Sequence, residues 1–341
     1  MTTFIARRLA LLPFVAVGVT VLIFSLLQFL TPAMRASLYI HDPKQLNALP
    51  DIIRKYDLDR PVYIQYWGWL RQVLHGDLGW SETAREPVAD AIRGYFPATL
   101  ELGMYSFACI LALGIWLGTA AAVNKDRALD HLSRFTSISG ASLPTFVWAL
   151  LLLMVFYGHF GWFPPGRLSL DADLYVRGGQ FHAYTGLMTI DALLNGQWWI
   201  FWDAVRHLVL PVATLTYYLT AVLVRITRSS MLETLRTDYV RTAEAKGLSH
   251  HVVIDKHARR NAMIPVITLG SLLFVGLLSG VVITETVFNL PGIGRWGVGA
   301  SQQLDIPAVT GFALVFAGLL VLANLCADVL YAVVDPRIRL R

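Results

Sequence analysis

The sequence predicts an all-α integral membrane protein with six transmembrane helices, and two observations carry this prediction. First, 55% of the 341 residues are hydrophobic and only 15% are charged, whereas soluble domains carry about 25% charged residues. Second, six segments approach or exceed the length of about 20 apolar residues that a helix needs to cross the hydrocarbon layer. This exchange of charge for apolar surface is what a bilayer requires.

The six predicted spans follow one another along the chain. They are residues 9–30, 98–123, 138–156, 208–224, 263–288 and 309–334. Three of them contain one carboxylate each, namely Glu101, Glu285 and Asp328, and the fourth contains Pro211. The first span is too long for a typical signal peptide and no small-residue cleavage site follows it, so we expect it to remain as a helix.

The distribution of basic residues predicts the orientation. With a cytoplasmic N-terminus, the inside segments are residues 1–8, 124–137, 225–262 and 335–341. They hold 16 Lys and Arg in 67 residues, against 12 in the 138 residues of the outside segments. This is the positive-inside bias, so we expect both termini to be cytoplasmic. The net charge of +5 then reflects topology and does not indicate nucleic-acid binding.

The chain divides into a first helix with an outer loop (1–97), a five-helix core (98–334) and a cytoplasmic tail (335–341). In the outer loop, Pro61 suits the first turn of a helix. Apolar residues then recur at helical spacing at Val62, Tyr66, Trp69, Leu70 and Val73. This helix is expected to lie on the outer surface, either as a docking surface for an external partner or as a cover for the bundle.

The loop 225–262 is the most informative segment. Its first half presents one apolar face, formed by Met231, Leu232, Leu235, Tyr239, Val240 and Ala243. Gly247 suits a left-handed helix stop, and Ser249 suits the cap of a second helix. We therefore predict a helix, a glycine turn and a second helix between the fourth and fifth spans. The alternative is a solvated, salt-bridged loop that only follows the positive-inside bias, since amphipathic loop helices are common in membrane proteins.

The residues of this loop closely resemble the EAA loop of ABC importer permeases. The segments that carry the resemblance are Tyr239-Val-Arg-Thr-Ala-Glu-Ala-Lys-Gly247 and His257-Ala-Arg-Arg-Asn-Ala-Met-Ile-Pro265. More narrowly, the sequence is similar to the first permease of the oligopeptide, dipeptide and nickel branch. Arg241 and Thr242 stand where the general motif has glutamate and its first alanine, which is usual in that branch.

The resemblance covers nearly the whole chain. Matching segments are Ile5–Arg8, Asp59–Pro61, His75–Gly79, Phe96–Leu102, Arg225–Met231, Thr284–Phe288, Pro291–Arg295 and Asp335–Arg339. One departure is Thr31-Pro32-Ala33-Met34, where many relatives carry Pro-Gly-Asp-Pro.

The resemblance implies an ABC type I importer permease fold with a cytoplasmic coupling loop, in the bacterial inner membrane. It implies transport of di- or oligopeptides; nickel chelates, glutathione and oligosaccharides are alternatives on the same scaffold. The implied partners are a second homologous permease, two cytoplasmic ATPases, an external substrate-binding protein and membrane lipid. The residues implied to couple to the ATPases are Tyr239, Arg241, Thr242, Ala243, Glu244, Lys246, Gly247 and His257.

The chain has no phosphate-binding Gly-Lys loop, because none of its five lysines follows a glycine. We expect no enzyme activity and no cofactor in this chain, with ATP and Mg²⁺ bound by the ATPases. His250 and His251 are adjacent and would face different directions on a helix, so we predict no metal site. Cys109 and Cys326 lie in apolar runs and are not expected to form a disulfide.

The three carboxylates within the spans, Glu101, Glu285 and Asp328, are candidates for the substrate pathway, because a charge in hydrocarbon is costly. The alternative for each is helix packing or anchoring at the interface. An ion-coupled secondary transporter is the rival class, but such proteins usually have internal repeats. No clear repeat is seen in this sequence, and neither that class nor a simple membrane anchor accounts for the helical loop 225–262.

Overall fold

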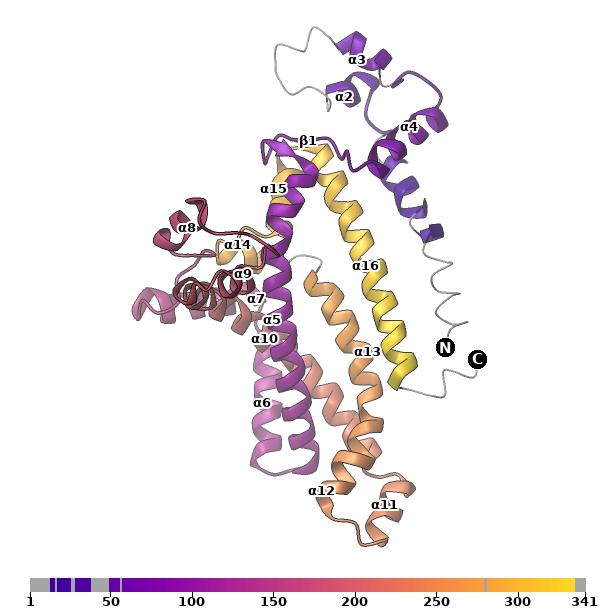
Figure 1. The fold of residues 1–341 in the computed structure, drawn as a ribbon. Coiled ribbons are helices and arrows are strands. Elements are labelled where there is room, and N and C mark those ends of the chain that lie inside the picture. Colours follow the sequence, from indigo (N-terminus) through magenta and orange to yellow (C-terminus); the bar gives the residue numbers. More distant parts are fainter. Residues whose placement is uncertain are drawn as a thin grey trace.

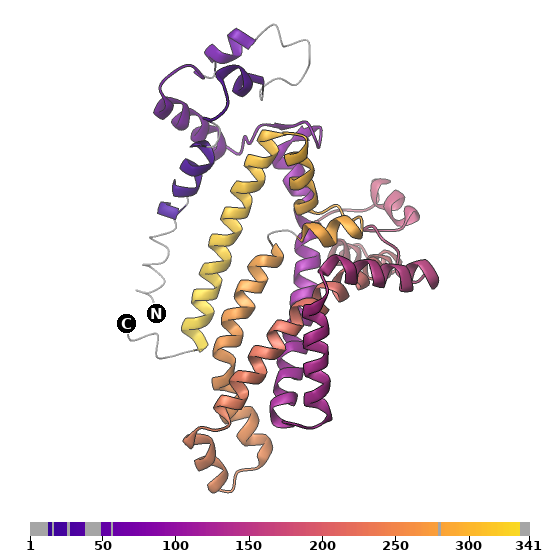
Figure 2. The same ribbon diagram turned by 180° about the vertical axis from the view of Figure 1, so that it is seen from behind.

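The computed structural model describes residues 13–15, 17–25, 28–37, 49–55, 57–278 and 281–334. In these residues the regular structure is helical except for one pair of short strands. Long helices lie side by side in an elongated bundle, with α4 at one end and α11 and α12 at the other (Figure 1, Figure 2). Shorter helices, α8 and α9, lie to one side of the bundle in both views.

The described residues of the segment predicted as the outer loop form three helices and the strand pair. They are α2 (Pro32–Ser37), α3 (Leu49–Lys55), α4 (Val62–Leu74), β1 (Trp80–Ser81) and β2 (Glu86–Pro87), with β1 and β2 antiparallel. The first half of the bundle follows. It consists of α5 (Val88–Val123), α6 (Ala128–Ser142), α7 (Thr145–Leu152) with the π-helical η2 (Leu153–His159), α8 (Leu170–Arg177), α9 (Met188–Leu194) and α10 (Trp198–Thr234).

The second half begins with the helical loop. It consists of α11 (Asp238–Ala245), α12 (His250–Val252), the π-helical η3 (Val253–Ala258), α13 (Arg259–Leu278), α14 (Val282–Val287), α15 (Ile293–Gln302) and α16 (Ile306–Val334). From His250 to Leu278 the segments α12, η3 and α13 form one continuous helix of 29 residues.

Among the described residues, three helices are long and apolar enough to cross a membrane: α5, α10 and His250–Leu278. A fourth candidate is a bent pair, Ala128–Gly140 with Thr145–His159, and two shorter apolar helices are Pro13–Ser25 and Ile306–Leu322. The described residues therefore form a multi-helix membrane protein, as predicted. They show three to four candidate spans by length and composition, where the sequence predicted six.

The third predicted span, residues 138–156, is not a straight helix. The chain bends by 102° between α6 and α7. Leu143 is extended, with φ −106° and ψ 138°, because the ring of Pro144 disfavours the helical region for the residue before it. The prediction of one continuous helix was wrong at this point.

The outer end of the fifth predicted span, residues 263–288, was also wrong. Helix α13 is described as far as Leu278, and Val281, with φ −95° and ψ 64°, is not helical and precedes the separate short helix α14. By contrast, the fourth span is much longer than residues 208–224, since α10 continues at both ends and holds Pro211 inside it. Apolar composition marks the part of a helix that suits hydrocarbon, whereas the backbone remains helical well beyond it.

Helix α10 packs closely against α5 and α6 through glycines. A Cβ on Gly114 of α5 would lie 2.5 Å from Leu223 Cδ2, and one on Gly118 would lie 2.5 Å from Thr227 Cβ. On α6, a Cβ on Gly140 would lie 3.0 Å from the Cβ of Ala221. Small residues let helix backbones approach closely, which is how helices associate without a hydrophobic driving force.

The predicted outer helix is present as α4. Tyr66 and Trp69 pack against Phe24, with ring centroids 5.3 and 5.6 Å away. Of the predicted apolar face, Val62 is exposed and the rest is half-buried. The buried residue of α4 is Gln65, whose amide oxygen accepts a hydrogen bond from Arg35.

Candidate coupling and transport sites

The predicted helix, glycine turn and second helix are present between α10 and α13. Gly247 has φ +73°, and two backbone hydrogen bonds close the end of α11 around it. The N–H of Gly247 donates to the carbonyl of Glu244 (2.9 Å), and that of Leu248 donates to Ala243 (3.4 Å). This pair of bonds is the Schellman motif, which requires a left-handed residue at the glycine position.

Two details of the loop differ from the prediction. Helix α10 continues to Thr234, so Met231 and Leu232 lie on it and not on the first loop helix. Ser249 does precede α12, but its side chain makes no capping hydrogen bond.

A small apolar core lies beneath the loop. Its buried members are Ala122, Met231, Val240, Ala243, Val253, Ala258 and Ala262. Tyr239 was predicted to belong to this face, but it is 43% exposed. Its hydroxyl instead accepts a hydrogen bond from the side-chain amide of Asn261 (2.9 Å), which ties α11 to α13.

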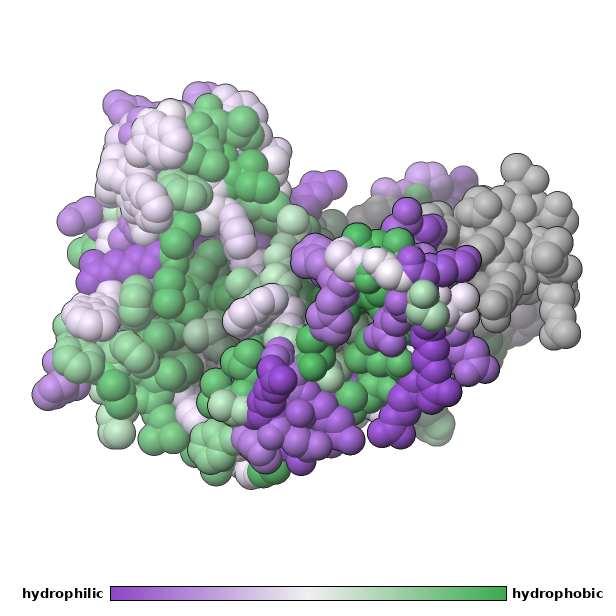
Figure 3. Space-filling view, turned by 90° about the horizontal axis from the view of Figure 1, so that it is seen from below, coloured by the Kyte–Doolittle hydropathy of each residue, from purple (hydrophilic) through white to green (hydrophobic). Residues whose placement is uncertain are grey.

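The predicted coupling residues divide between the surface and this core. Tyr239, Arg241, Thr242, Glu244, Lys246 and Gly247 are exposed, His257 is half-buried and Ala243 is buried. The Arg241 guanidinium lies 3.7 Å from Asp238, and both side chains are largely exposed, so this ion pair is weak and leaves the arginine accessible. Viewed from this end, hydrophilic side chains gather beside a broad apolar flank of the bundle (Figure 3).

The predicted pathway carboxylate Glu101 is only 3% exposed and is bound by another element. It accepts hydrogen bonds from the backbone N–H of Thr189 (2.7 Å) and of Met188 (3.2 Å), and from the Thr189 hydroxyl (2.6 Å). Arg167 lies 3.5 Å away. Glu101 therefore caps the first turn of α9, whose N–H groups have no partner within their own helix.

The second pathway carboxylate, Glu285, does the same for α15. It is fully buried and accepts from the Thr99 hydroxyl (2.6 Å) and the backbone N–H of Arg295 (2.7 Å). The oxygen of Thr99 in turn accepts from the N–H of Ile293 (2.9 Å). A Cβ on Gly292 would lie 2.2 Å from the Glu285 carboxyl carbon, so the carboxylate fills this turn.

The geometry of Glu101 and Glu285 thus favours the packing interpretation over the substrate pathway. Sequence reasoning missed their partners, because these lie 88 and 186 residues away along the chain. The third carboxylate, Asp328, lies on α16, but its side chain is outside the described residues. The terminal segments 1–8 and 335–341 are also outside them.

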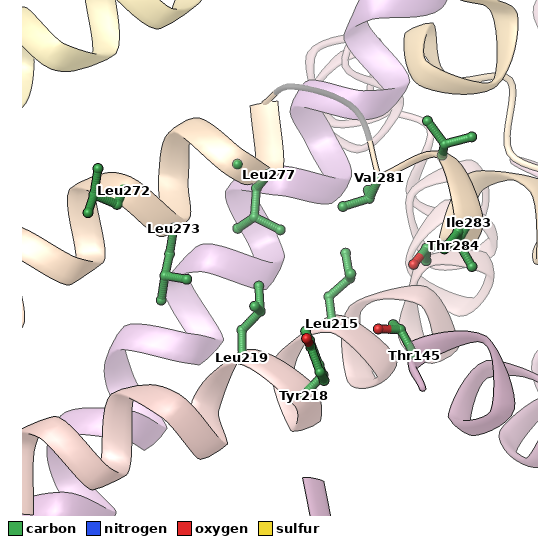
Figure 4. Close-up of a pocket in the computed structure, with 12 residues that line it drawn as sticks. Thr145, Leu215, Tyr218, Leu219, Leu272, Leu273, Leu277, Val281, Ile283 and Thr284 are labelled. Atoms are coloured by element: carbon green, nitrogen blue, oxygen red, sulfur yellow. The ribbon is translucent and has the colours of Figure 1, made fainter. Parts of the chain in front are cut away.

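An apolar pocket of about 440 Å³ lies between α10 and the α13–α14 region (Figure 4). Leu215 and Leu219 line it from α10, and Leu273 and Leu277 line it from α13. Hydroxyl groups come from Thr145, Tyr218 and Thr284, and none of the described lining residues is charged. The sequence did not single out this pocket, because Tyr218 is one of several hydroxyl residues in the span 208–224, together with Thr214, Thr216, Tyr217 and Thr220.

A further buried carboxylate, Asp130, was not singled out from the sequence. It lies in the first turn of α6 with its side chain fully buried, and two arginines bind it. Its sequence signal was Arg134 four residues later, the spacing of an ion pair on one helix face. Within the described residues, no group of three potential metal ligands is found.

Comparison with known proteins gives consistent matches. The family model for the binding-protein-dependent transport system inner membrane component matches residues 112–340. The di/tripeptide transport system permease protein DppB of Pseudomonas aeruginosa is 42% identical over 99% of both chains. The probable D,D-dipeptide transport system permease protein DdpB of Escherichia coli is 41% identical, over 95% of this chain and 94% of its own. The oligopeptide transport system permease protein AppB of Bacillus subtilis is 35% identical over 99% of both.

Proposed function

Because the chain belongs to the family of binding-protein-dependent transport system inner membrane components, we propose that it is the membrane-spanning permease subunit of an ATP-driven peptide importer. The observation that carries the peptide class is the full-length similarity to a di/tripeptide permease. The other relatives named above support the same class, since their names refer to dipeptides and oligopeptides.

The proposed arrangement retains six membrane crossings. Helices α5, α10 and His250–Leu278 supply three of them, and the bent pair of α6 and α7–η2 supplies a fourth. The apolar helix Pro13–Ser25 and α16 supply the first and last. The density of Lys and Arg supports a cytoplasmic position for the helical loop and for both termini.

In this arrangement α11 and α12 form the coupling element. The exposed side of α11 carries charged side chains that would position an ATPase. Its buried side shares an apolar core with residues of α10 and α13, so a push on the loop reaches both helices. Two ATPase subunits would bind here and hold ATP and Mg²⁺, since no phosphate-binding loop is found in this sequence. A second permease and an external binding protein would complete the importer.

The pocket between α10 and α13 is a candidate part of the substrate path. Its apolar wall and hydroxyl groups suit peptide side chains and amide groups, and it offers no counter-ion for the charged ends of a peptide. The chain would then let peptides pass without holding them tightly, which is what rapid release requires.

Uptake by the reconstituted importer tests this function. Liposomes containing the chain with its permease and ATPase partners should accumulate labelled dipeptides when ATP and the binding protein are supplied. Uptake should persist after an uncoupler collapses the proton gradient, because ATP drives it. Preference for a nickel chelate, glutathione or an oligosaccharide would reassign the substrate. Uptake that needs the ion gradient and not ATP would overturn the proposal.

A further inference from the structure

The buried carboxylate Asp130 joins two segments that lie far apart in the sequence. The Arg228 guanidinium of α10 donates to both of its oxygens, at 2.6 and 2.9 Å. Arg134 donates at 2.7 Å from the next turn of α6, and the backbone N–H of Asp126 donates at 3.0 Å. A carboxylate with its oxygens bound in this way, and no exposure to water, holds its partners in one geometry.

The Asp130–Arg228–Arg134 cluster lies close to the helical loop. Arg228 lies less than two turns before the end of α10 at Thr234, and α11 follows after a short turn. Asp130 lies just after the connection from α5 to α6. Helix α10 also packs directly against the glycines of α5 and α6 described above, where a Cβ would come too close to it. The ion pair thus fixes the α5–α6 hairpin to α10 next to the loop.

Helix α13 also packs against α5 and α10, since the rings of Phe107 and Phe274 lie 4.8 Å apart and the Ser230 hydroxyl donates to the carbonyl of Ala262 (2.9 Å). The apolar pocket lies between α10 and α13, and a second groove of about 630 Å³ lies between α5 and the helix that begins at His250. A third pocket, of about 510 Å³, lies among α5, α6 and α10, so these three helices are distinguished from α13 by the buried ion pair and the glycine contacts, and not by an absence of cavities.

We propose that Asp130 is a positioning residue for transport, which makes α5, α6 and α10 move as one body when the loop is displaced. This inference rests on the proposed function, because it takes the loop as the element that the ATPases push. Without the carboxylate, α10 would tilt relative to the α5–α6 hairpin, and ATP hydrolysis would move the loop without moving the pathway. The readout is therefore the number of peptides taken up per ATP hydrolysed.

The test compares Asp130→Asn with Asp126→Asn in reconstituted importers. Asp126 is a matched control, because its exposed carboxylate also binds Arg134 (3.1 Å), while no hydrogen bond or ion pair joins it to α10 in the described part of the chain. Asp130→Asn should keep the ATPases bound and lower the peptides taken up per ATP by about three- to tenfold. Asp126→Asn should leave the ratio unchanged. Arg228→Lys, which keeps the charge but loses the two-pronged contact, should lower it in the same direction.

Three results would overturn the proposal. The first is an equal ratio of peptides to ATP in Asp130→Asn and Asp126→Asn. The second is an Asp130→Asn chain that does not accumulate in the membrane while Arg228→Lys couples normally. The third is failure of both variants to accumulate in the membrane. In the second and third cases, Asp130 has a structural role only. Failure of the proposed function looks different, because the unsubstituted complex would itself show no ATP-dependent peptide uptake.

Discussion

At the scale of single residues, Gly247 has a backbone conformation that disfavours most side chains. Its φ of +73° is strained for a β-branched residue, while a Cβ would meet no atom within 4 Å. Gly247→Val should therefore disturb the turn without a steric clash, at a cost of roughly 1–2 kcal/mol. We expect normal insertion and a loss of ATPase binding, measured by pull-down from detergent.

A matched control for this substitution exists between α9 and α10. Gly196 has φ +69° and equally open surroundings, but it lies outside the loop. Gly196→Val should carry the same backbone strain and leave ATPase binding intact. If Gly247→Val retains both full ATPase association and full uptake, the loop is not the coupling element.

Arg241 tests the charge of the same face. Its side chain is 69% exposed and its pair with Asp238 is weak, so Arg241→Glu should weaken ATPase binding by reversing an accessible charge. The control is Arg93→Glu, which breaks the corresponding pair with Asp90 on α5, in the outer half of the proposed topology. Equal effects of the two substitutions on ATPase affinity at low salt would argue against a contact at Arg241.

The buried carboxylates lead to a prediction about stability. In Glu285→Gln, an amide N–H₂ would replace one of the two oxygens that now accept from Thr99 and from the N–H of Arg295. We expect a loss of about 1–3 kcal/mol, the cost of an unsatisfied buried group, seen as a lower melting temperature in detergent. Glu82→Gln, at an exposed position, is the control. Slower uptake at unchanged stability would return Glu285 to the substrate pathway.

At the scale of helices, contact between α5 and α10 depends on Gly118. A Cβ there would lie 2.5 Å from Thr227 Cβ and 3.0 Å from the carbonyl oxygen of Val224, so Gly118→Ala must separate the two helices. A Cβ on Gly94, in the same helix, would meet no atom within 4 Å. Gly94→Ala should be neutral or stabilising by up to about 1 kcal/mol, because alanine favours helix. We expect Gly118→Ala to lower the melting temperature in detergent, and Gly94→Ala to leave it unchanged or raise it.

Hydrophobic periodicity and composition predicted the helices whose apolar faces can be recognised from neighbouring residues in the sequence. Both loop helices, the turn at Gly247 and the outer helix α4 belong to this group. The break before Pro144 was also readable in principle, because proline restricts the residue before it. The capping of α9 by Glu101 was not, since nothing local in the sequence links groups 88 residues apart. Contacts of this kind arise only when the chain has folded.

At the scale of the whole molecule, orientation is directly testable. In a chain with Cys109 and Cys326 replaced by alanine, we expect Ser249→Cys to react with an impermeant thiol reagent only from the cytoplasm. Ser169→Cys should react only from outside, because it lies in the segment between the third and fourth spans. The cysteine-free chain should react from neither side. A reversed labelling pattern would invert the topology.

The unbroken helix from His250 to Leu278 has a kinematic consequence. Its 29 residues span about 43 Å, so a tilt of about 10° about its outer end would sweep the tip near α12 through about 7 Å. The midpoint would travel only about half as far. The helix would thus act as a lever: a large displacement of the loop produces a smaller displacement, with a larger force, at the middle of the helix.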